Sequence, residues 1–211
     1  MKIGGLMTFT LNDYPGKVAA IVFTQGCNFR CPFCHNGDLL DAEPGPHVVS
    51  EDALFEFLES RRGRLDGLVI SGGEPTLQPD LADFIRRVRE FGYAVKLDTN
   101  GSRPRVVREL LEAGLLDFVA MDVKAPLHAY ERLTGVSVAQ DRIAESIRLI
   151  AASGVAHEFR TTVVEALLSK EDVEEIQGAI PSGSPHRLQT FRPEHALDPA
   201  LRAETEVTAA D

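Results

Sequence analysis

The sequence contains no apolar run that approaches the length of a membrane span, and its first residues lack the apolar h-region of a secretory signal peptide. Positive charge is also scarce, because the chain has 22 Lys and Arg residues against 32 Asp and Glu residues, which gives a formal net charge of −10. Extended nucleic-acid binding needs many side chains that neutralise phosphates. We therefore expect a cytoplasmic protein that binds neither membranes nor nucleic acid, and that meets proteins or small molecules instead.

Cysteine occurs only three times in 211 residues, at Cys27, Cys31 and Cys34. Thiolates are the preferred ligands of soft metals and iron–sulfur clusters, and a loop this short can aim three of them at one centre. Iron–sulfur clusters usually take four protein thiolates, so a chain without a fourth cysteine leaves one iron with an open coordination position. Catalytic zinc sites keep an open coordination position, whereas structural zinc sites do not. By analogy, an open position on the cluster indicates a catalytic role.

Two other interpretations of these cysteines are weaker. A zinc site made of the three cysteines and His35 is chemically feasible, but structural zinc usually draws its ligands from two separated pairs. A disulfide framework conflicts with the odd number of cysteines and the absent secretory signal. The spacing therefore favours an iron–sulfur cluster.

The rest of the chain alternates short apolar segments with amphipathic ones, and its 44% hydrophobic content suits one domain with a substantial core. The apolar segments predict six strands, at residues 17–24, 67–71, 94–99, 117–123, 157–164 and 187–191. Helices are expected at 51–62, after Pro79, at 104–112, at 140–152 and from Ser169 onward. Six βα units predict a parallel sheet with helices outside it. The pattern leaves open whether the sheet is flat or curls into a barrel.

Polar motifs follow the predicted strands, where active sites of parallel α/β proteins lie. They are Ser71-Gly72-Gly73-Glu74-Pro75, Asp98-Thr99-Asn100-Gly101 and Asp122-Val123-Lys124. Paired glycines let a ligand approach the backbone, although Gly-Gly and Asn-Gly are also common turns. The next strand carries Arg160 between apolar residues, and a buried Arg needs a partner, either a ligand carboxylate or a protein Asp or Glu.

The cysteine loop, residues 26–36, resembles that of the radical S-adenosylmethionine (SAM) enzymes. Its ending Cys34-His35-Asn36 is similar to the activating enzymes of glycyl-radical proteins. The segments 13–17 (Asp-Tyr-Pro-Gly-Lys) and 22–26 (Val-Phe-Thr-Gln-Gly) most resemble the activating proteins of anaerobic ribonucleoside-triphosphate reductases. The resemblance covers roughly residues 5–193 and is most specific in the cysteine loop.

This resemblance implies an α/β fold, an open (β/α)6 partial TIM barrel, as a single radical SAM domain over residues 1–193. The Ala- and Glu-rich tail, residues 194–211, is expected to be poorly ordered. The resemblance also implies one 4Fe-4S cluster with an open iron site, held by the three cysteines, and SAM as the second cofactor. The residues implied to bind SAM are Phe33, Gly72, Gly73, Glu74, Asp98, Asn100, Asp122, Lys124 and Arg160. A monovalent cation at Asp98, Thr99 and Asp122 is implied as well.

Three further side chains receive weaker expectations. His35 is expected to fix the cysteine loop from outside the ligand set. Gln189 and Arg192, near the last strand, are expected to face either SAM or a partner protein.

The function implied is reductive cleavage of SAM and removal of a glycine Cα hydrogen, which installs a glycyl radical on the large subunit of anaerobic ribonucleotide reductase. The implied reductant is a flavodoxin or ferredoxin. Activation of another glycyl-radical enzyme, such as a pyruvate formate-lyase, remains open, as does radical SAM chemistry on a small molecule. A non-catalytic iron–sulfur or zinc module is the alternative from another class. An activase needs an open barrel mouth, so plugging by residues 1–16 or by the tail would contradict it.

Overall fold

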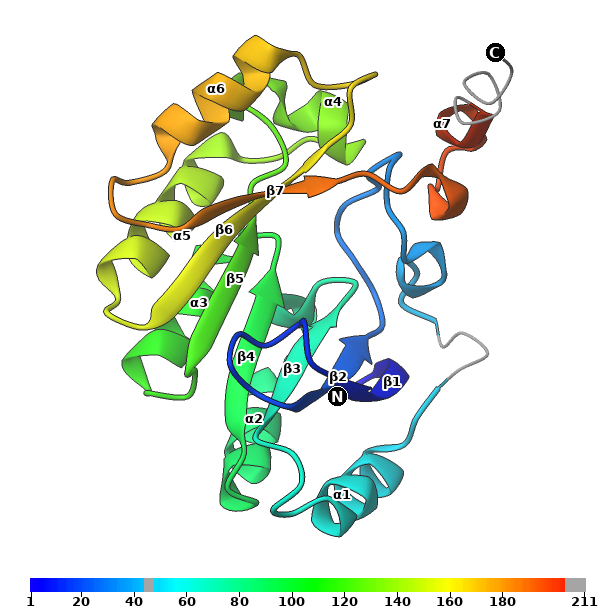
Figure 1. Cartoon of the computed structure of the whole chain (residues 1–211), viewed down its shortest axis with the longest axis vertical. Helices are drawn as coiled ribbons and strands as arrows, with labels where there is room; N and C mark the ends of the chain where they lie inside the picture. The colour runs from blue at the N-terminus through cyan, green and yellow to red at the C-terminus, as the bar shows by residue number, and fades with distance from the viewer. Residues whose placement is uncertain (44–47, 204–211) are drawn as a thin grey trace.

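A seven-stranded sheet forms the centre of the computed structural model, which describes residues 1–43 and 48–203 (Figure 1). The strands lie side by side in chain order: β1 Ile3–Thr10, β2 Ala19–Thr24, β3 Gly67–Gly72, β4 Ala94–Thr99, β5 Phe118–Asp122, β6 Ala156–Val163 and β7 His186–Thr190. Strands β2 to β7 are parallel, and β1 is antiparallel to β2. The predicted α/β fold of six parallel strands is therefore confirmed. Within the described residues β1 and β7 do not pair, so the sheet is open, as in a partial barrel.

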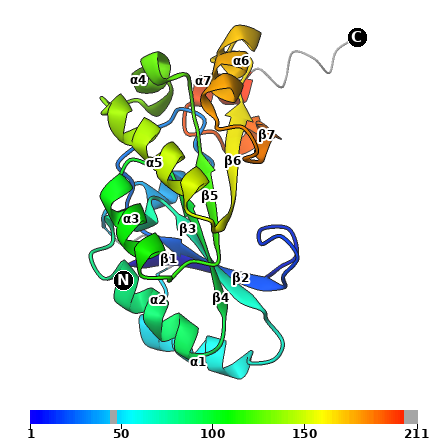
Figure 2. The same ribbon diagram turned by 90° about the vertical axis from the view of Figure 1, so that its left-hand side faces the viewer.

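Helices connect the parallel strands, and Figure 2 shows α2, α3 and α5 together along one face of the sheet. The helices are α1 Glu51–Ser60, α2 Leu81–Glu90, α3 Pro104–Glu112, α4 Tyr130–Thr134, α5 Gln140–Ala152, α6 Lys170–Ala179 and α7 Pro199–Ala203. Ser50 caps α1 by accepting a hydrogen bond from Ala53 N, and Ser169 with Asp172 forms the capping box of α6. In the described part of the chain, no helix has the length and apolarity that a membrane span requires.

Strand alternation divides the sheet side chains between two packed regions. Leu68 and Ile70 of β3 point into the large core beneath the helices. Val69, between them, points to the opposite face and packs with Ile21 and Tyr14 in a smaller cluster. Tyr14 belongs to the segment between β1 and β2, which therefore covers part of the second face. The carboxyl ends of the parallel strands remain available for the site.

The fold differs from the expectation in three places. Strand β1 and helix α4 are not among the predicted elements, and β1 extends the sheet beyond β2. The segment from Glu194 to Ala203, expected to be poorly ordered, contains α7 and most of a 3-10 helix that begins at Pro193. Ala196 and Leu201 are buried in the main core, which gives this segment a reason to pack. The rest of the expected tail, 204–211, lies outside the described residues.

Candidate functional site

A cavity of about 390 Å³ opens at the carboxyl ends of the parallel strands. It is lined by the cysteine loop and by residues from the ends of β3 to β7. The lining includes each side chain that the resemblance assigned to the cluster, to SAM or to a cation: Cys27, Cys31, Phe33, Cys34, Gly72, Gly73, Glu74, Asp98, Thr99, Asn100, Asp122, Lys124 and Arg160. His35 and Gln189 also line it. The structure therefore brings the predicted site residues to one place.

Backbone hydrogen bonds fix the cysteine loop at both of its sides. The Cys27 N–H donates to Leu40 O at 2.9 Å, which ties the start of the loop to the segment after it. The Arg30 N–H donates to Thr134 O at 2.7 Å. Gly135 has a φ of +68°, and a Cβ there would lie 2.6 Å from Arg30 O. A glycine after α4 is therefore required for this close approach.

The three thiols are in reduced, unpaired form, with Cys31 buried and the other two half-buried. Burial raises the pKa of the Cys31 thiol to about 11, although the charge of Lys124 acts against the rise. Burial also raises the pKa of Cys27. Both thiols are therefore neutral at pH 7 unless a metal centre draws off the proton.

The donor set fits a cluster better than a single zinc ion. Among the residues described, no three His, Cys, Asp or Glu side chains converge on a point that one metal ion could occupy. A zinc ion needs four ligands within about 2.0–2.3 Å of one point. A four-iron cluster spreads its thiolates over separate iron atoms, and three cysteines lining one cavity meet that requirement.

Glu74 follows β3 and is completely buried. Its Oε1 accepts hydrogen bonds from the Thr76 hydroxyl at 2.5 Å and the Thr99 hydroxyl at 2.7 Å, and its Oε2 accepts from Asn100 N at 2.7 Å. Burial raises the pKa of Glu74, while these hydrogen bonds oppose the rise. The side chain thus joins the end of β3 to the end of β4, and its carboxylate faces protein donors.

Replacing Glu74 with glutamine should destabilise the protein by about 2 kcal/mol, because in either orientation the new amide N–H₂ would face a backbone N–H, that of Asn100 or that of Thr76, where a carboxylate oxygen now accepts. Urea unfolding at pH 7 measures the change. The matched control is Glu109→Gln, which alters an exposed pair with Arg105 on α3 and should stay within about 0.5 kcal/mol. Equal stability of the Glu74 variant and wild type would show that this junction does not depend on the carboxylate.

A second set of hydrogen bonds ties the cysteine loop to the end of β4. Asn28 donates from Nδ2 to Ser102 Oγ at 2.9 Å, and its Oδ1 accepts from Asn100 Nδ2 at 3.0 Å. The Asn100 side chain therefore faces the cysteine loop. Sequence analysis did not identify Asn28, since a single Asn inside a loop carries no distinctive pattern.

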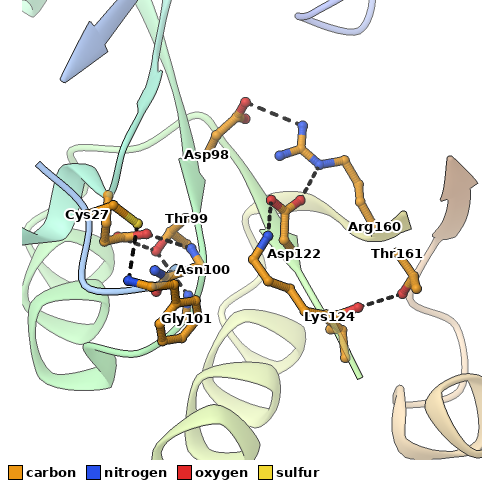
Figure 3. A network of polar contacts seen from close by, with 12 residues as sticks. Cys27, Asp98, Thr99, Asn100, Gly101, Asp122, Lys124, Arg160 and Thr161 are labelled. Carbon is orange, nitrogen blue, oxygen red and sulfur yellow. Dashed lines mark hydrogen bonds and ion pairs between the residues drawn. The ribbon is translucent and has the colours of Figure 1, made fainter. Parts of the chain in front are cut away.

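Five charged side chains from β4, β5 and β6 form a continuous set of ion pairs, called here the strand-end network: Lys96, Asp98, Arg160, Asp122 and Lys124. Lys96 Nζ lies 2.6 Å from Asp98 Oδ1, and Arg160 Nη1 lies 3.3 Å from Asp98 Oδ2. Arg160 Nε lies 2.9 Å from Asp122 Oδ1, and Lys124 Nζ lies 3.4 Å from Asp122 Oδ2. Figure 3 shows Asp98 and Asp122 both directed at Arg160.

Within this network, Asp122, Lys124 and Arg160 favour one another's charged forms. Burial opposes the ionisation of Asp122, but the charges of Arg160 and Lys124 prevail and lower its pKa to about 2. Burial likewise opposes the charged form of Lys124, while Asp122 raises its pKa. The partners of the buried Arg160 are therefore two protein carboxylates, those of Asp98 and Asp122.

The structure brings together only two of the three side chains predicted to bind a monovalent cation. Asp98 and Asp122 both contact Arg160. The Thr99 hydroxyl instead donates to Glu74, and in Figure 3 it lies beside Asn100. Strand alternation explains the difference, because Asp98 and Thr99 are neighbours on β4 and must point to opposite faces.

Of the remaining predicted residues, Phe33, His35 and Gln189 line the cavity. Phe33 is buried, with Lys124 Nζ 5.8 Å from its ring centre. The ring of His35 stacks on Phe191 at 5.7 Å, which ties the end of the cysteine loop to the segment after β7. Burial lowers the pKa of His35. Arg192 is absent from the described cavity lining.

Comparisons with known proteins identify the family of the chain. The radical SAM superfamily model matches residues 21–183. The chain is 36% identical over 203 residues to a Methanocaldococcus jannaschii protein described as a candidate glycyl-radical enzyme activating enzyme, covering 93% of this chain and 82% of that one. It is 34% identical over 187 residues to the pyruvate formate-lyase 1-activating enzyme of Escherichia coli K12, covering 85% and 70%.

The fold is also found among solved structures. Streptococcus suis SuiB bound to S-adenosylmethionine matches with a TM-score of 0.58 and 17% identity, over 80% of this chain and 39% of that one. At this identity the match shows the fold alone. The extent of the family match and of the two relatives shows that the chain belongs to the radical SAM superfamily and, within it, to the activating enzymes of glycyl-radical enzymes.

Proposed function

We propose that this enzyme installs a glycyl radical on anaerobic ribonucleoside-triphosphate reductase. The observation that carries the proposal is the open mouth of a cavity lined by the cysteine loop and the strand ends. Of residues 1–16, only Asp13 lines it, and within the described chain no residue after Gln189 does. In the part of the chain that the structure describes, neither the N-terminal segment nor the residues after β7 plug it, and a loop of a large protein would have access. The segment Asp13 to Lys17, with its resemblance to activators of this reductase, supports the choice of partner.

Membership of the radical SAM superfamily implies a 4Fe-4S cluster and SAM. We assign the cluster to Cys27, Cys31 and Cys34. Three thiolates leave one of the four irons without a protein ligand, and SAM would bind at that iron. A reduced cluster held there would supply the electron for reductive cleavage of SAM, and with it the oxidising power to remove the glycine Cα hydrogen, with methionine and 5′-deoxyadenosine as the products.

The chain's own residues bind and orient SAM in this proposal. Gly72 and Gly73 have no Cβ and leave the backbone at the end of β3 open to the amine and carboxylate end of SAM. Lys124 and Arg160 face the cavity with positive charge that suits the SAM carboxylate. Phe33 offers an aromatic ring for the adenine. Glu74 acts as a positioning residue, because its carboxylate holds the end of β4.

The other residues that the resemblance assigns to SAM lie at the ends of β4 and β5. We propose that Asp98 and Asp122 act through the cations they hold, and that Asn100 acts mainly by anchoring the cysteine loop. The monovalent cation at Asp98, Thr99 and Asp122 stays a prediction of the family resemblance, and the ion pairs at the two carboxylates weigh against it. A cation at the two carboxylates would compete with Arg160, which already contacts both.

The experiment that tests the function is 5′-deoxyadenosine formation by anaerobically reconstituted enzyme with dithionite and SAM, with and without the large subunit of the reductase. We expect formation that rises with the reductase, together with a glycyl EPR signal on it. The same assay with flavodoxin or ferredoxin in place of dithionite tests the proposed reductants, which fit the reducing cytoplasm where an oxygen-sensitive cluster persists.

The pyruvate formate-lyase type remains the second candidate, because the Escherichia coli activator of that enzyme is a 34% identical relative. Pyruvate formate-lyase is therefore the matched partner for the same assay. A glycyl signal on the lyase and none on the reductase would reject the proposed partner but keep the activase. Formation of 5′-deoxyadenosine that is indifferent to both proteins would point to a small-molecule substrate.

A further inference from the structure

Lys96 is a completely buried cation three residues before Thr99, the last residue of β4. Its neighbours Val95 and Leu97 point into the main core, so alternation directs Lys96 and Asp98 together to the opposite face. The Lys96 side chain is only 1% exposed. An ammonium group this deep must have a partner, and Lys96 Nζ has Asp98 Oδ1 at 2.6 Å and the Phe118 ring at 5.8 Å.

The position of Lys96 separates it from the rest of the strand-end network. Asp98, Asp122, Lys124 and Arg160 line the cavity, whereas Lys96 is absent from the described lining. Lys96 therefore does not reach a ligand in the cavity directly. It acts on the site only through Asp98.

Each of the four carboxylate oxygens in the network has a cationic side chain as its partner. Asp98 Oδ1 has Lys96 and Oδ2 has Arg160, while Asp122 Oδ1 has Arg160 and Oδ2 has Lys124. A sodium or potassium ion at Asp98 would share an oxygen with one of these cations and be repelled by it, and the buried Lys96 already neutralises the inward oxygen.

The count of charges has a second consequence. Three cations against two carboxylates leave the network with a net charge of +1, which attracts an anionic group. Without Lys96 the two remaining cations balance the two carboxylates. Asp98 would then have Arg160 as its one remaining partner in the network and would draw that guanidinium toward itself.

We propose that Lys96 is a positioning residue that replaces a bound monovalent cation: its ammonium fixes Asp98, and through Asp98 the Arg160 guanidinium, where the carboxylate of SAM binds. This inference rests on the proposed SAM site. It implies that SAM binding by this enzyme does not depend on which monovalent cation is in solution.

The test compares wild type and Lys96→Met in KCl, NaCl and choline chloride at equal ionic strength. One measurement is the melting temperature of the protein without cluster, and the other is the SAM dissociation constant of anaerobically reconstituted protein by equilibrium dialysis. For wild type we expect both values to be the same in the three salts. For Lys96→Met we expect about tenfold weaker SAM binding in choline chloride, equivalent to the loss of one charge-assisted contact, and partial recovery in KCl or NaCl.

The matched control is Arg108→Met, which removes one cation from the pair with Glu145 between α3 and α5, at 2.6 Å, and makes the same change in net charge. Its SAM binding should not respond to the identity of the salt. Lys96→Arg, which keeps the charge, should retain more of the wild-type affinity than Lys96→Met.

Three results would overturn the inference. Wild-type SAM binding that tightens severalfold in KCl or NaCl would show that a bound cation acts beside Lys96, and this measurement needs no variant to fold. Wild-type affinity in Lys96→Met would show that Lys96 does not act on the site. Loss of stability without any response to salt identity would make Lys96 structural alone. Wild type that fails to bind SAM in every salt would contradict the proposed function, whereas the melting temperatures of the cluster-free variants would still test Lys96.

Discussion

Cys31→Ala is expected to abolish SAM cleavage while leaving the chain folded. Cys31 lines the cavity with Cys27 and Cys34, and each thiolate of a three-cysteine loop is needed to hold the cluster. Changes to residues that only orient a metal ligand cost about 10- to 100-fold in metal affinity or activity, so the loss of a direct ligand should exceed about 100-fold.

The fold should survive this substitution for two reasons. The turn of the loop is held by the Cys34 N–H, which donates to the Cys31 carbonyl at 3.0 Å and does not involve the side chain. The Cys31 thiol, with its pKa raised to about 11 by burial, is neutral in the cluster-free protein, so its removal breaks no ion pair. We expect a loss of about 1 kcal/mol in the free energy of unfolding, typical of a small buried truncation.

The measurements are 5′-deoxyadenosine by chromatography, iron content after reconstitution, and urea unfolding of the cluster-free protein. Cys31→Ser is the control for volume, since it keeps a small polar side chain but lacks the soft sulfur ligand. Near-normal cleavage by either variant would show that the cluster takes a ligand other than the three cysteines.

The location of the site could be predicted from sequence because it follows from a geometric rule. Asp98 and Asp122 each come at the end of a short apolar segment, and in a parallel sheet such ends meet at one edge. That rule requires only the strands and their direction. The cysteine loop could be identified just as directly, because three cysteines this closely spaced are typical of very few kinds of site.

The contacts between side chains could not be predicted in the same way. Lys96 lies in a strand of alternating character, where a lysine ordinarily indicates a solvent-exposed face, and its burial depends on β5 and on Asp98. For Arg160 the sequence left two classes of partner open, and the register of β4, β5 and β6 decided between them. The packing of Lys96 against Phe118 and the ion pairs of Arg160 join segments that are distant in the sequence, and periodicity does not encode such contacts.

Strand β1 was missed for a local reason. Its pair Gly4-Gly5 is unfavourable in strands and obscures the alternation. In the fold, a Cβ on Gly4 would meet the side chains of Gln25 and Leu39, so the glycine serves the close approach of β1 to the start of the cysteine loop. A residue that weakens the local signal is thus explained by tertiary packing.

Gly73→Ala is expected to disable the site by moving the backbone that carries Cys27. A Cβ at Gly73 would collide with the carbonyl oxygen of Gly26 and would lie 2.8 Å from Leu39 O. Both are backbone atoms, which cannot rotate away as a side chain could. The neighbouring Glu74 N–H donates to the same Gly26 oxygen at 2.8 Å, so relief of the collision also strains this hydrogen bond.

Two effects should follow from this collision. Overpacking against backbone should cost about 3 kcal/mol and lower the melting temperature by roughly 6–12 °C. Displacement of Gly26 also shifts Cys27, and a misplacement of about 1 Å at a reacting centre can cost about 100-fold in rate. We therefore expect SAM cleavage to fall by about 100-fold even at a temperature where the variant remains folded.

Gly178→Ala is the matched control, because Gly178 lies within α6 and a Cβ there would meet no atom within 4 Å. The same substitution at this position should raise stability by about 0.5–1 kcal/mol, since alanine favours a helix more than glycine does. Its SAM cleavage should equal that of wild type. If Gly73→Ala retained both stability and cleavage, the end of β3 would have room to move, and the close packing of Gly73 on Gly26 would not be what holds the cysteine loop at the cavity.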